Sequence, residues 1–332
     1  MLYTRRELGQ LALAGVPAAG FLLKPGAAAA ALADKPNSKW AGVQVGLNVP
    51  YSFRMGNDMS GDETLARCVK LGVSAVELRS QPVEAFLGSP AAAAAAARGA
   101  QAAGRGRTGG GRAPLTPEQE AARKTAAEEL RKWRLSVPMS RVKEFRKKWE
   151  DAGVAIEIVK FDGIYGLTDE GLDYSFELAK NLGARAISCE IDVPQTKRVG
   201  QFADKHKMMV GYHGHASTGP AHWEEAFSFS KHNGANLDIG HFIAGQNTSP
   251  VPFLKQHHGR ITHLHVKDRK MNDGATTPFG QGDVPVAEIL RLLRDNKWNI
   301  QATIEYEYTP PEGSDSMNEI AKCLQFCKEA LI

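Results

Sequence analysis

The chain has 332 residues, of which 42% are hydrophobic and 23% are charged, and its formal net charge at pH 7 is +4. This composition excludes a disordered or collagen-like chain, and the length allows one large domain core. The small net charge gives no support for a nucleic-acid partner, because binding to phosphates requires a strongly basic surface.

The N-terminal residues 1–33 predict a twin-arginine export signal. Arg5 and Arg6 precede a weakly apolar run that Pro17 interrupts, and this run is too short to span a bilayer comfortably. Residues 31–33 have the A-x-A pattern of a cleavage site. We therefore expect a periplasmic or otherwise exported protein with no membrane segment after cleavage. An uncleaved anchor and a misassigned start codon are the alternatives.

From Val43 onward, short apolar or β-branched runs alternate with segments of helical periodicity, which predicts parallel strands joined by crossover helices. Eight such units indicate an α/β fold, a single (β/α)8 TIM barrel over residues 34–332. Gly72, Gly153 and Gly183 each follow a predicted helix, where a left-handed residue is favoured, and Thr168 is expected to cap a helix. The expected strands are residues 43–47, 73–79, 154–160, 184–189, 208–212, 236–239, 261–266 and 302–306.

Residues 88–133 form an insertion after the second predicted strand. Its first part is rich in alanine, glycine and arginine and has no acidic residue between Ser89 and Pro114, which is typical of a flexible low-complexity segment. A charged helical segment from Pro117 to Trp133 leads back to the barrel. Because loops after barrel strands open on the catalytic face, the insertion is either a lid or an expansion without function.

Polar side chains gather at the ends of five consecutive predicted strands. In a barrel these ends meet at one mouth, and residues two apart on a strand share a face, so we expect the side chains to converge. In chain order, the residues at these ends are Glu190, His213 with His215, Asp238 with His241, His265 with Lys267, and Glu305 with Glu307.

Two imidazoles and two carboxylates of this set, those of His213, Asp238, His265 and Glu305, predict one divalent metal site. Such mixed nitrogen and oxygen ligands suit Mn, Co, Zn or Fe better than Ca, and Mg also stays open. A lone strand histidine is more often a core or surface residue than a ligand. The coincidence at four consecutive strand ends favours the metal.

Five short motifs resemble the xylose-isomerase-like barrel superfamily and appear in its order. They are G-Y-H-G-H at 211–215, L-D-I-G-H at 237–241, H-V-K-D at 265–268, F-G-Q-G-D at 279–283 and I-E-Y-E at 304–307. The similarity is closest to proteins labelled sugar phosphate isomerase/epimerase, and it extends to exported enzymes that act on 3-keto-glycosides by elimination or hydration.

The resemblance implies roles for individual residues. Asp238, His265 and Glu305 match metal ligands of the family, and His241 and Gln281 match substrate-binding positions. The chain departs from the family at strand five, where many epimerases have a glutamate ligand and this sequence has His213. A simple two-glutamate epimerase mechanism therefore does not follow, and Glu190 is the candidate for the missing carboxylate. The candidate catalytic residues are Glu190, His215, Lys267 and Glu307.

The predicted enzyme is a metal-dependent lyase or isomerase/epimerase that removes the proton α to a sugar carbonyl. Because phosphorylated sugars are kept in the cytoplasm, an exported protein favours elimination or hydration of 3-keto-glycosides, and the alternative is isomerisation or epimerisation of free ketoses. An endonuclease-IV-like phosphodiesterase and a noncatalytic sugar-binding protein are less favoured. The expected partner is a small carbohydrate, and a homo-oligomer stays open.

The four cysteines, Cys68, Cys189, Cys323 and Cys327, show no C-x-x-C pair and no zinc-finger spacing. We expect them to be small buried side chains, although an oxidising compartment leaves a disulfide open.

Overall fold

The computed structural model describes residues 35–53, 59–93 and 116–332. The export signal and residues 94–115 of the predicted insertion lie outside the described residues, so both interpretations stay predictions. Residues 35–332 group into one compact unit. Within the described ranges, no helix combines the length and the apolar character that a bilayer crossing requires.

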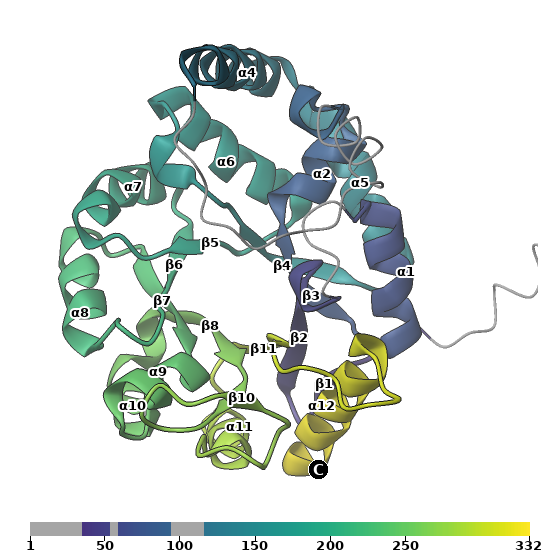
Figure 1. Ribbon diagram of the computed structural model, residues 1–332, viewed down its shortest axis with the longest axis vertical. Helices are drawn as coiled ribbons and strands as arrows, with labels where there is room; N and C mark the ends of the chain where they lie inside the picture. Colours follow the sequence, from purple (N-terminus) through teal and green to yellow (C-terminus); the bar gives the residue numbers. More distant parts are fainter. Residues whose placement is uncertain (1–34, 54–58, 94–115) are drawn as a thin grey trace, which may run out of the picture. The chain divides into compact units, whose positions relative to one another are not determined.

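Eight parallel strands close into a ring, which confirms the predicted (β/α)8 barrel. From β2 the order runs through β3, β4, β5, β6, β7, β8 and β11, and β11 pairs with β2 to close it. Figure 1 shows this ring with helices around its outside. The barrel strands are β2 Val43–Val49, β3 Ala75–Arg79, β4 Ala155–Lys160, β5 Ala186–Glu190, β6 Met209–His213, β7 Asn233–Asp238, β8 Ile261–Val266 and β11 Gln301–Ile304.

The remaining elements are helices around the barrel and short strands at its ends. The short strands are β1 Lys39–Trp40, β9 Asp268–Arg269 and β10 Thr276–Thr277. The α-helices are α1 Gly61–Leu71, α2 Ser80–Phe86, α4 Pro117–Ser136, α5 Met139–Asp151, α6 Asp169–Leu182, α7 Val193–His206, α8 Pro220–Phe229, α9 Ile239–Gln246, α10 Val251–His257, α11 Val286–Asp295 and α12 Ser316–Leu331. The 3-10 helices are η3 Tyr51–Phe53, η5 Ile164–Gly166 and η6 His258–Arg260.

The strand bounds differ from the expectation most at β7, which begins at Asn233 and not at residue 236. The residues Asn233, Gly234 and Ala235 have low β propensity, but all three are buried and pair with β6. The neighbouring strand therefore imposes the extended conformation. The glycine caps behave as expected, since Gly72, Gly153 and Gly183 have φ values of 72, 84 and 83°.

The connection from β3 to β4 contains α2, α4 and α5, and α4 confirms the helix expected after the low-complexity segment. None of the side chains of α4 is buried. The helix packs beside α6, and Arg134 pairs with Glu84 of α2 at 2.8 Å. The many charged residues of α4 therefore agree with its position on the outer surface of the barrel.

The apolar core lies between the strands and the surrounding helices, whereas the inside of the barrel is unusually polar. Barrel interiors are usually filled by valine, isoleucine and leucine. Here Glu77 of β3 contacts Ser188 of β5 and His263 of β8, strands that are not its neighbours, so these buried contacts cross the interior. The four cysteines are buried and unpaired, as expected.

Thr168→Ala is expected to lower the free energy of unfolding by about 1 kcal/mol, because the Thr168 side chain accepts a hydrogen bond from the Gly171 amide at the start of α6. Because helix α6 packs many buried side chains against the barrel, loss of this cap lowers the free energy of unfolding of the whole fold. The matched control is Thr116→Ala, which removes the cap of α4, a helix with no buried side chain. Urea unfolding of both variants should show the smaller change for Thr116→Ala.

Candidate active site

The four predicted metal ligands meet at the C-terminal ends of their strands. The Nδ1 atom of His265 lies 3.1 Å from Oε2 of Glu305 and 3.8 Å from Oδ2 of Asp238. The rings of His213 and His265 have centroids 4.6 Å apart. All four side chains are buried. The structure therefore brings the four predicted residues to the same part of the barrel mouth.

Each of these four residues has one buried side-chain atom to which no directed hydrogen bond is assigned among the described residues, although the ammonium group of Lys267 lies beside two of these atoms. The atoms are His213 Nδ1, Asp238 Oδ2, His265 Nδ1 and Glu305 Oε2. A divalent cation at this point would be held by imidazole nitrogens and carboxylate oxygens together, and it would share the two carboxylates with Lys267. The donor set of two imidazole nitrogens and two carboxylate oxygens thus fits a metal such as Mn, Co, Zn or Fe.

His241 lies closer to this set than its predicted role requires. One group of donor atoms within 4.8 Å of one another comes from His213, Asp238, His241 and Glu305, and another comes from His213, His215 and His241. His265 belongs instead to a third group, with Glu77 and His263. His241, expected to contact substrate, is therefore a second candidate for the fourth ligand position.

The ammonium group of Lys267 lies among three carboxylates. Its Nζ is 2.9 Å from Asp238, 2.5 Å from Glu305 and 2.7 Å from Glu307. Burial opposes the charge, but the carboxylates, Asp238 first, hold the pKa of Lys267 well above its usual value. The pKa of Glu305 lies well below its usual value because His265 and Lys267 outweigh the effect of burial. Lys267 therefore stays charged and balances the carboxylates.

Lys160, Glu190 and His215 form a second chain of contacts at the mouth. Buried Lys160 donates to Oε1 of Glu190 at 2.6 Å, and Nε2 of His215 lies 2.8 Å from Oε2 of the same carboxylate. Although burial acts in the opposite direction, His215 and Lys160 lower the pKa of Glu190 to about 2. The hydrogen bond to Glu190 raises the pKa of His215. Because the His215 side chain is 59% exposed, a ligand at the mouth can reach its ring.

Glu307 is held from two sides, by the Tyr51 hydroxyl, which donates at 2.8 Å, and by Lys267. Lys267 also lies 3.2 Å from Nε2 of His241, and Arg269 lies 2.7 Å from Nδ1 of the same ring. Burial is the main reason that the pKa of His241 is lowered, and the imidazole is therefore neutral.

The motif that contains Gln281 is positioned by Asp268. The two oxygens of Asp268 accept hydrogen bonds from the amides of Gly280, Gly282 and Val284 at 2.8, 2.9 and 3.2 Å. A Cβ atom on Gly282 would lie 1.9 Å from Oδ1 of Asp268, so only glycine fits. Gln281 itself is exposed, and no hydrogen bond joins its side chain to another described residue. Its predicted substrate contact stays a prediction.

Several residues of the site were not singled out in the sequence. Asn48 of β2 donates to Oε1 of Glu305 at 2.7 Å, and Lys160 and Tyr51 hold Glu190 and Glu307. Glu77, like Asn48, has no exposed surface. A charged residue in the middle of the apolar strand sequence A-V-E-L-R is the signal that points to Glu77.

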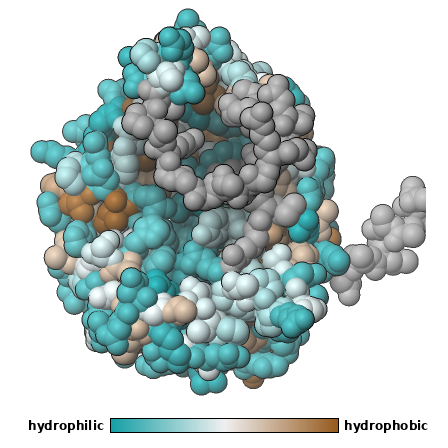
Figure 2. All heavy atoms as spheres, in the orientation of Figure 1, coloured by the Kyte–Doolittle hydropathy of each residue, from teal (hydrophilic) through white to brown (hydrophobic). Residues whose placement is uncertain are grey.

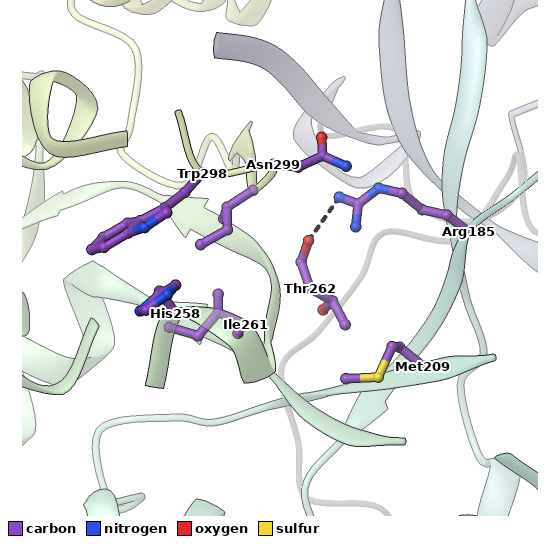
Figure 3. Close-up of a pocket in the computed structure, with 9 residues that line it drawn as sticks. Arg185, Met209, His258, Ile261, Thr262, Trp298 and Asn299 are labelled. Atoms are coloured by element: carbon purple, nitrogen blue, oxygen red, sulfur yellow. Dashed lines mark hydrogen bonds between the residues drawn. The ribbon is translucent and has the colours of Figure 1, made fainter. Parts of the chain in front are cut away.

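A cavity of ≈ 280 Å³ lies at the opposite end of the barrel, where the strands begin. It is lined by Arg185, Met209 and Ile261 from strand starts, and Figure 3 shows Arg185 bonded to the carbonyl of Thr262. His258 stacks on Trp298. The lining has no carboxylate among the described residues and thus no metal-ligand set. Residues at this end of a barrel usually serve stability.

The face drawn in Figure 2 is largely hydrophilic around the barrel.

A family model described as xylose isomerase-like TIM barrel matches residues 65–329, more than half of the chain. Two curated relatives from Clostridium botulinum strains, both named inosose dehydratase, are 29% identical over 155 residues, which is 40% of this chain and 51% of each relative. The chain therefore spans about half the length of the curated relatives it matches.

Solved structures share the fold over most of the chain. The xylose isomerase domain protein from Planctomyces limnophilus has a TM-score of 0.56 at 16% identity, covering 88% of this chain and 97% of that chain. A probable 3-DHS dehydratase from Bacillus anthracis has a TM-score of 0.54 at 14% identity, with 86% and 99% covered. D-Psicose 3-epimerase from Clostridium cellulolyticum H10 has a TM-score of 0.54 at 11% identity, with 87% and 99% covered. At these identities the likeness shows the fold.

Proposed function

The chain belongs to the xylose isomerase-like TIM barrel family, and from this premise we propose that it is a metal-dependent sugar lyase. In this proposal the enzyme removes the proton α to a sugar carbonyl and expels a group from the neighbouring carbon. The substrate class is a 3-keto-glycoside, acted on by elimination or by the related hydration. The alternative is isomerisation or epimerisation of a free ketose.

The observation that carries the proposal is the convergence of buried imidazole nitrogens and carboxylate oxygens from His213, Asp238, His265 and Glu305 at the barrel mouth. A divalent ion bound there supplies a Lewis acid for a substrate carbonyl and its neighbouring hydroxyl group. Hydrogen bonds from neighbouring residues hold the two carboxylate ligands in place. Asn48 donates to Glu305, and the His241 amide donates to Asp238 at 2.7 Å. These contacts orient the carboxylates before any substrate arrives.

We assign proton removal to His215. Its Nε2 atom faces the Glu190 carboxylate, which accepts only, so the ring proton lies on Nε2 and Nδ1 keeps its lone pair. Glu190 makes the ring a stronger base and stabilises the imidazolium that forms when Nδ1 takes a proton. Lys160 holds the other oxygen of Glu190 and keeps the carboxylate in place.

The contacts of Glu190 and the identity of residue 213 favour elimination over epimerisation. A two-carboxylate epimerase needs a glutamate on each face of the substrate, but Glu190 is paired with both Lys160 and His215. The ligand at the end of β6 is His213, an imidazole. The curated relatives are named dehydratases, and a dehydratase also eliminates a group, in that case water.

In a 3-keto-glycoside the bonds that react are those at C1 and C2. His215 takes the proton from C2, which is acidic because it lies beside the C3 carbonyl. The electron pair forms a C1–C2 double bond, and the C1–oxygen bond to the aglycone breaks. The leaving oxygen takes a proton from water, and the hydroxide that remains receives the proton held by His215. The products are an unsaturated keto sugar and the free aglycone, and no oxidant or reductant is needed.

The test uses a 3-keto-glycoside that carries a p-nitrophenyl aglycone, incubated with purified protein and Mn²⁺ or Co²⁺. The expected result is release of p-nitrophenol that depends on added metal and stops with a chelator. Solvent deuterium should also appear at C2 of substrate recovered before completion if proton removal is reversible. Absence of release, together with rapid epimerisation of a free ketose, would favour the alternative function.

A further inference from the structure

The metal-facing histidine His265 is in contact with a carboxylate on its other side. The Nε2 atom of His265 lies 2.5 Å from Oε2 of Glu77, while its Nδ1 faces Glu305 and Asp238. Glu77 is on β3, across the barrel from β8. Both side chains have no exposed surface. The imidazole ring therefore spans from the barrel interior to the proposed metal site.

The Glu77 carboxylate contacts a histidine through each of its oxygens. Nε2 of His265 lies beside Oε2, and Nε2 of His263 lies 3.2 Å from Oε1. Ser188 also donates to Oε1 of Glu77. A buried charge held only by such contacts is expensive, and an apolar residue of similar volume is often as stable or more so. Fold stability alone therefore gives no reason for a glutamate here.

The carboxylate determines which nitrogen of His265 carries a proton. An ionised carboxylate is an acceptor only, so the short contact requires a proton on Nε2 of His265. In the neutral ring the lone pair is then on Nδ1, the atom that faces Asp238 and Glu305. Carboxylate–histidine–metal arrangements of this kind fix the tautomer and the ring orientation of a metal ligand.

We propose that Glu77 is a positioning residue that presents Nδ1 of His265 to the metal. This inference rests on the proposed metal-dependent function and names the residue that prepares its histidine ligand. Removal of the carboxylate frees the ring to rotate or to move its proton to Nδ1. The expected consequence is a loss of metal affinity of about 10- to 100-fold, the usual effect of removing such a partner.

The experiment measures the dissociation constants of Zn²⁺ and Mn²⁺ for the full protein by chelator competition. Glu77→Gln keeps the volume and one oxygen, so we expect weakening of about 10-fold, and Glu77→Ala should weaken binding further. Ser188→Ala is the matched control, because it removes a different partner of the same carboxylate and leaves the His265 contact intact. Its affinity should stay within about threefold of the wild type. Circular dichroism and thermal unfolding report whether each variant is folded.

A second readout does not depend on the variants. Side-chain ¹H–¹⁵N correlation spectra of the zinc-loaded wild type should show His265 protonated at Nε2, and Glu77→Gln should change this signal. Protonation at Nδ1 would overturn the inference. So would wild-type affinity in both Glu77 variants while Asp238→Asn loses metal, and in that case the proposed function survives. Failure of the wild type to bind either metal overturns both.

Discussion

Asp238→Asn is expected to lose the bound metal and to lower kcat/KM for the keto-glycoside by about 10³-fold or more, equivalent to about 4 kcal/mol of transition-state stabilisation. Asp238 has two separate tasks. Its Oδ1 accepts from the His241 amide and caps α9, whereas its Oδ2 faces His265 and pairs with Lys267 at 2.9 Å. Asparagine is an equally good helix cap. The substitution therefore removes the charge and keeps the helix start.

The measurement is metal content after gel filtration, by inductively coupled plasma mass spectrometry, together with the aglycone assay. Asp204→Asn is the matched control, since Asp204 carries the same charge but pairs with Ser230 and His232 outside the proposed site. It should keep the metal and the activity. If Asp238→Asn retains metal and full activity, the assignment of the metal site is wrong.

His215→Gln is expected to reduce kcat by about 10²- to 10⁴-fold while the protein still binds metal, because it removes the proposed base and leaves the four ligands in place. Glutamine can keep a hydrogen bond to Glu190 but cannot accept the substrate proton. His222→Gln is the matched control, since the His222 ring contacts only the Gly219 backbone among the described residues. Its activity should equal that of the wild type.

This experiment also separates two roles for His215. Its ring nitrogen lies within 4.8 Å of those of His213 and His241, so ligation of the metal by His215 is the competing interpretation. A base variant loses turnover and keeps metal, whereas a ligand variant loses both. Loss of metal from His215→Gln would therefore contradict the assignment of His215 as the base.

Much of the barrel followed from local sequence patterns. Periodicity predicted all eight barrel strands, and Gly72, Gly153 and Gly183 predicted helix ends, because left-handed backbone favours glycine. The start of β7 was missed because Asn233 and Gly234 are poor strand residues that neighbouring strands hold in the sheet.

The composition of the candidate site was largely visible in the sequence as well. Strand ends of a barrel converge, so motifs with Asp238, His265 and Glu305 indicated one cluster, and the structure places these residues together. The pairings within the cluster were not visible. Lys267 and Glu307 were candidates for catalysis, and their ion pair, shared with Asp238 and Glu305, depends on side-chain reach.

The sequence by itself determined the order of strands and helices, the caps, and the residue types at the barrel mouth, because these depend on neighbours along the chain. Only the tertiary structure decided that Glu77 meets His265 and that His215 meets Glu190. Barrel closure and strand stagger set the distances between strands that are far apart in the sequence. Competition among buried charges for few partners then decides which pairs form, and no local pattern records that outcome.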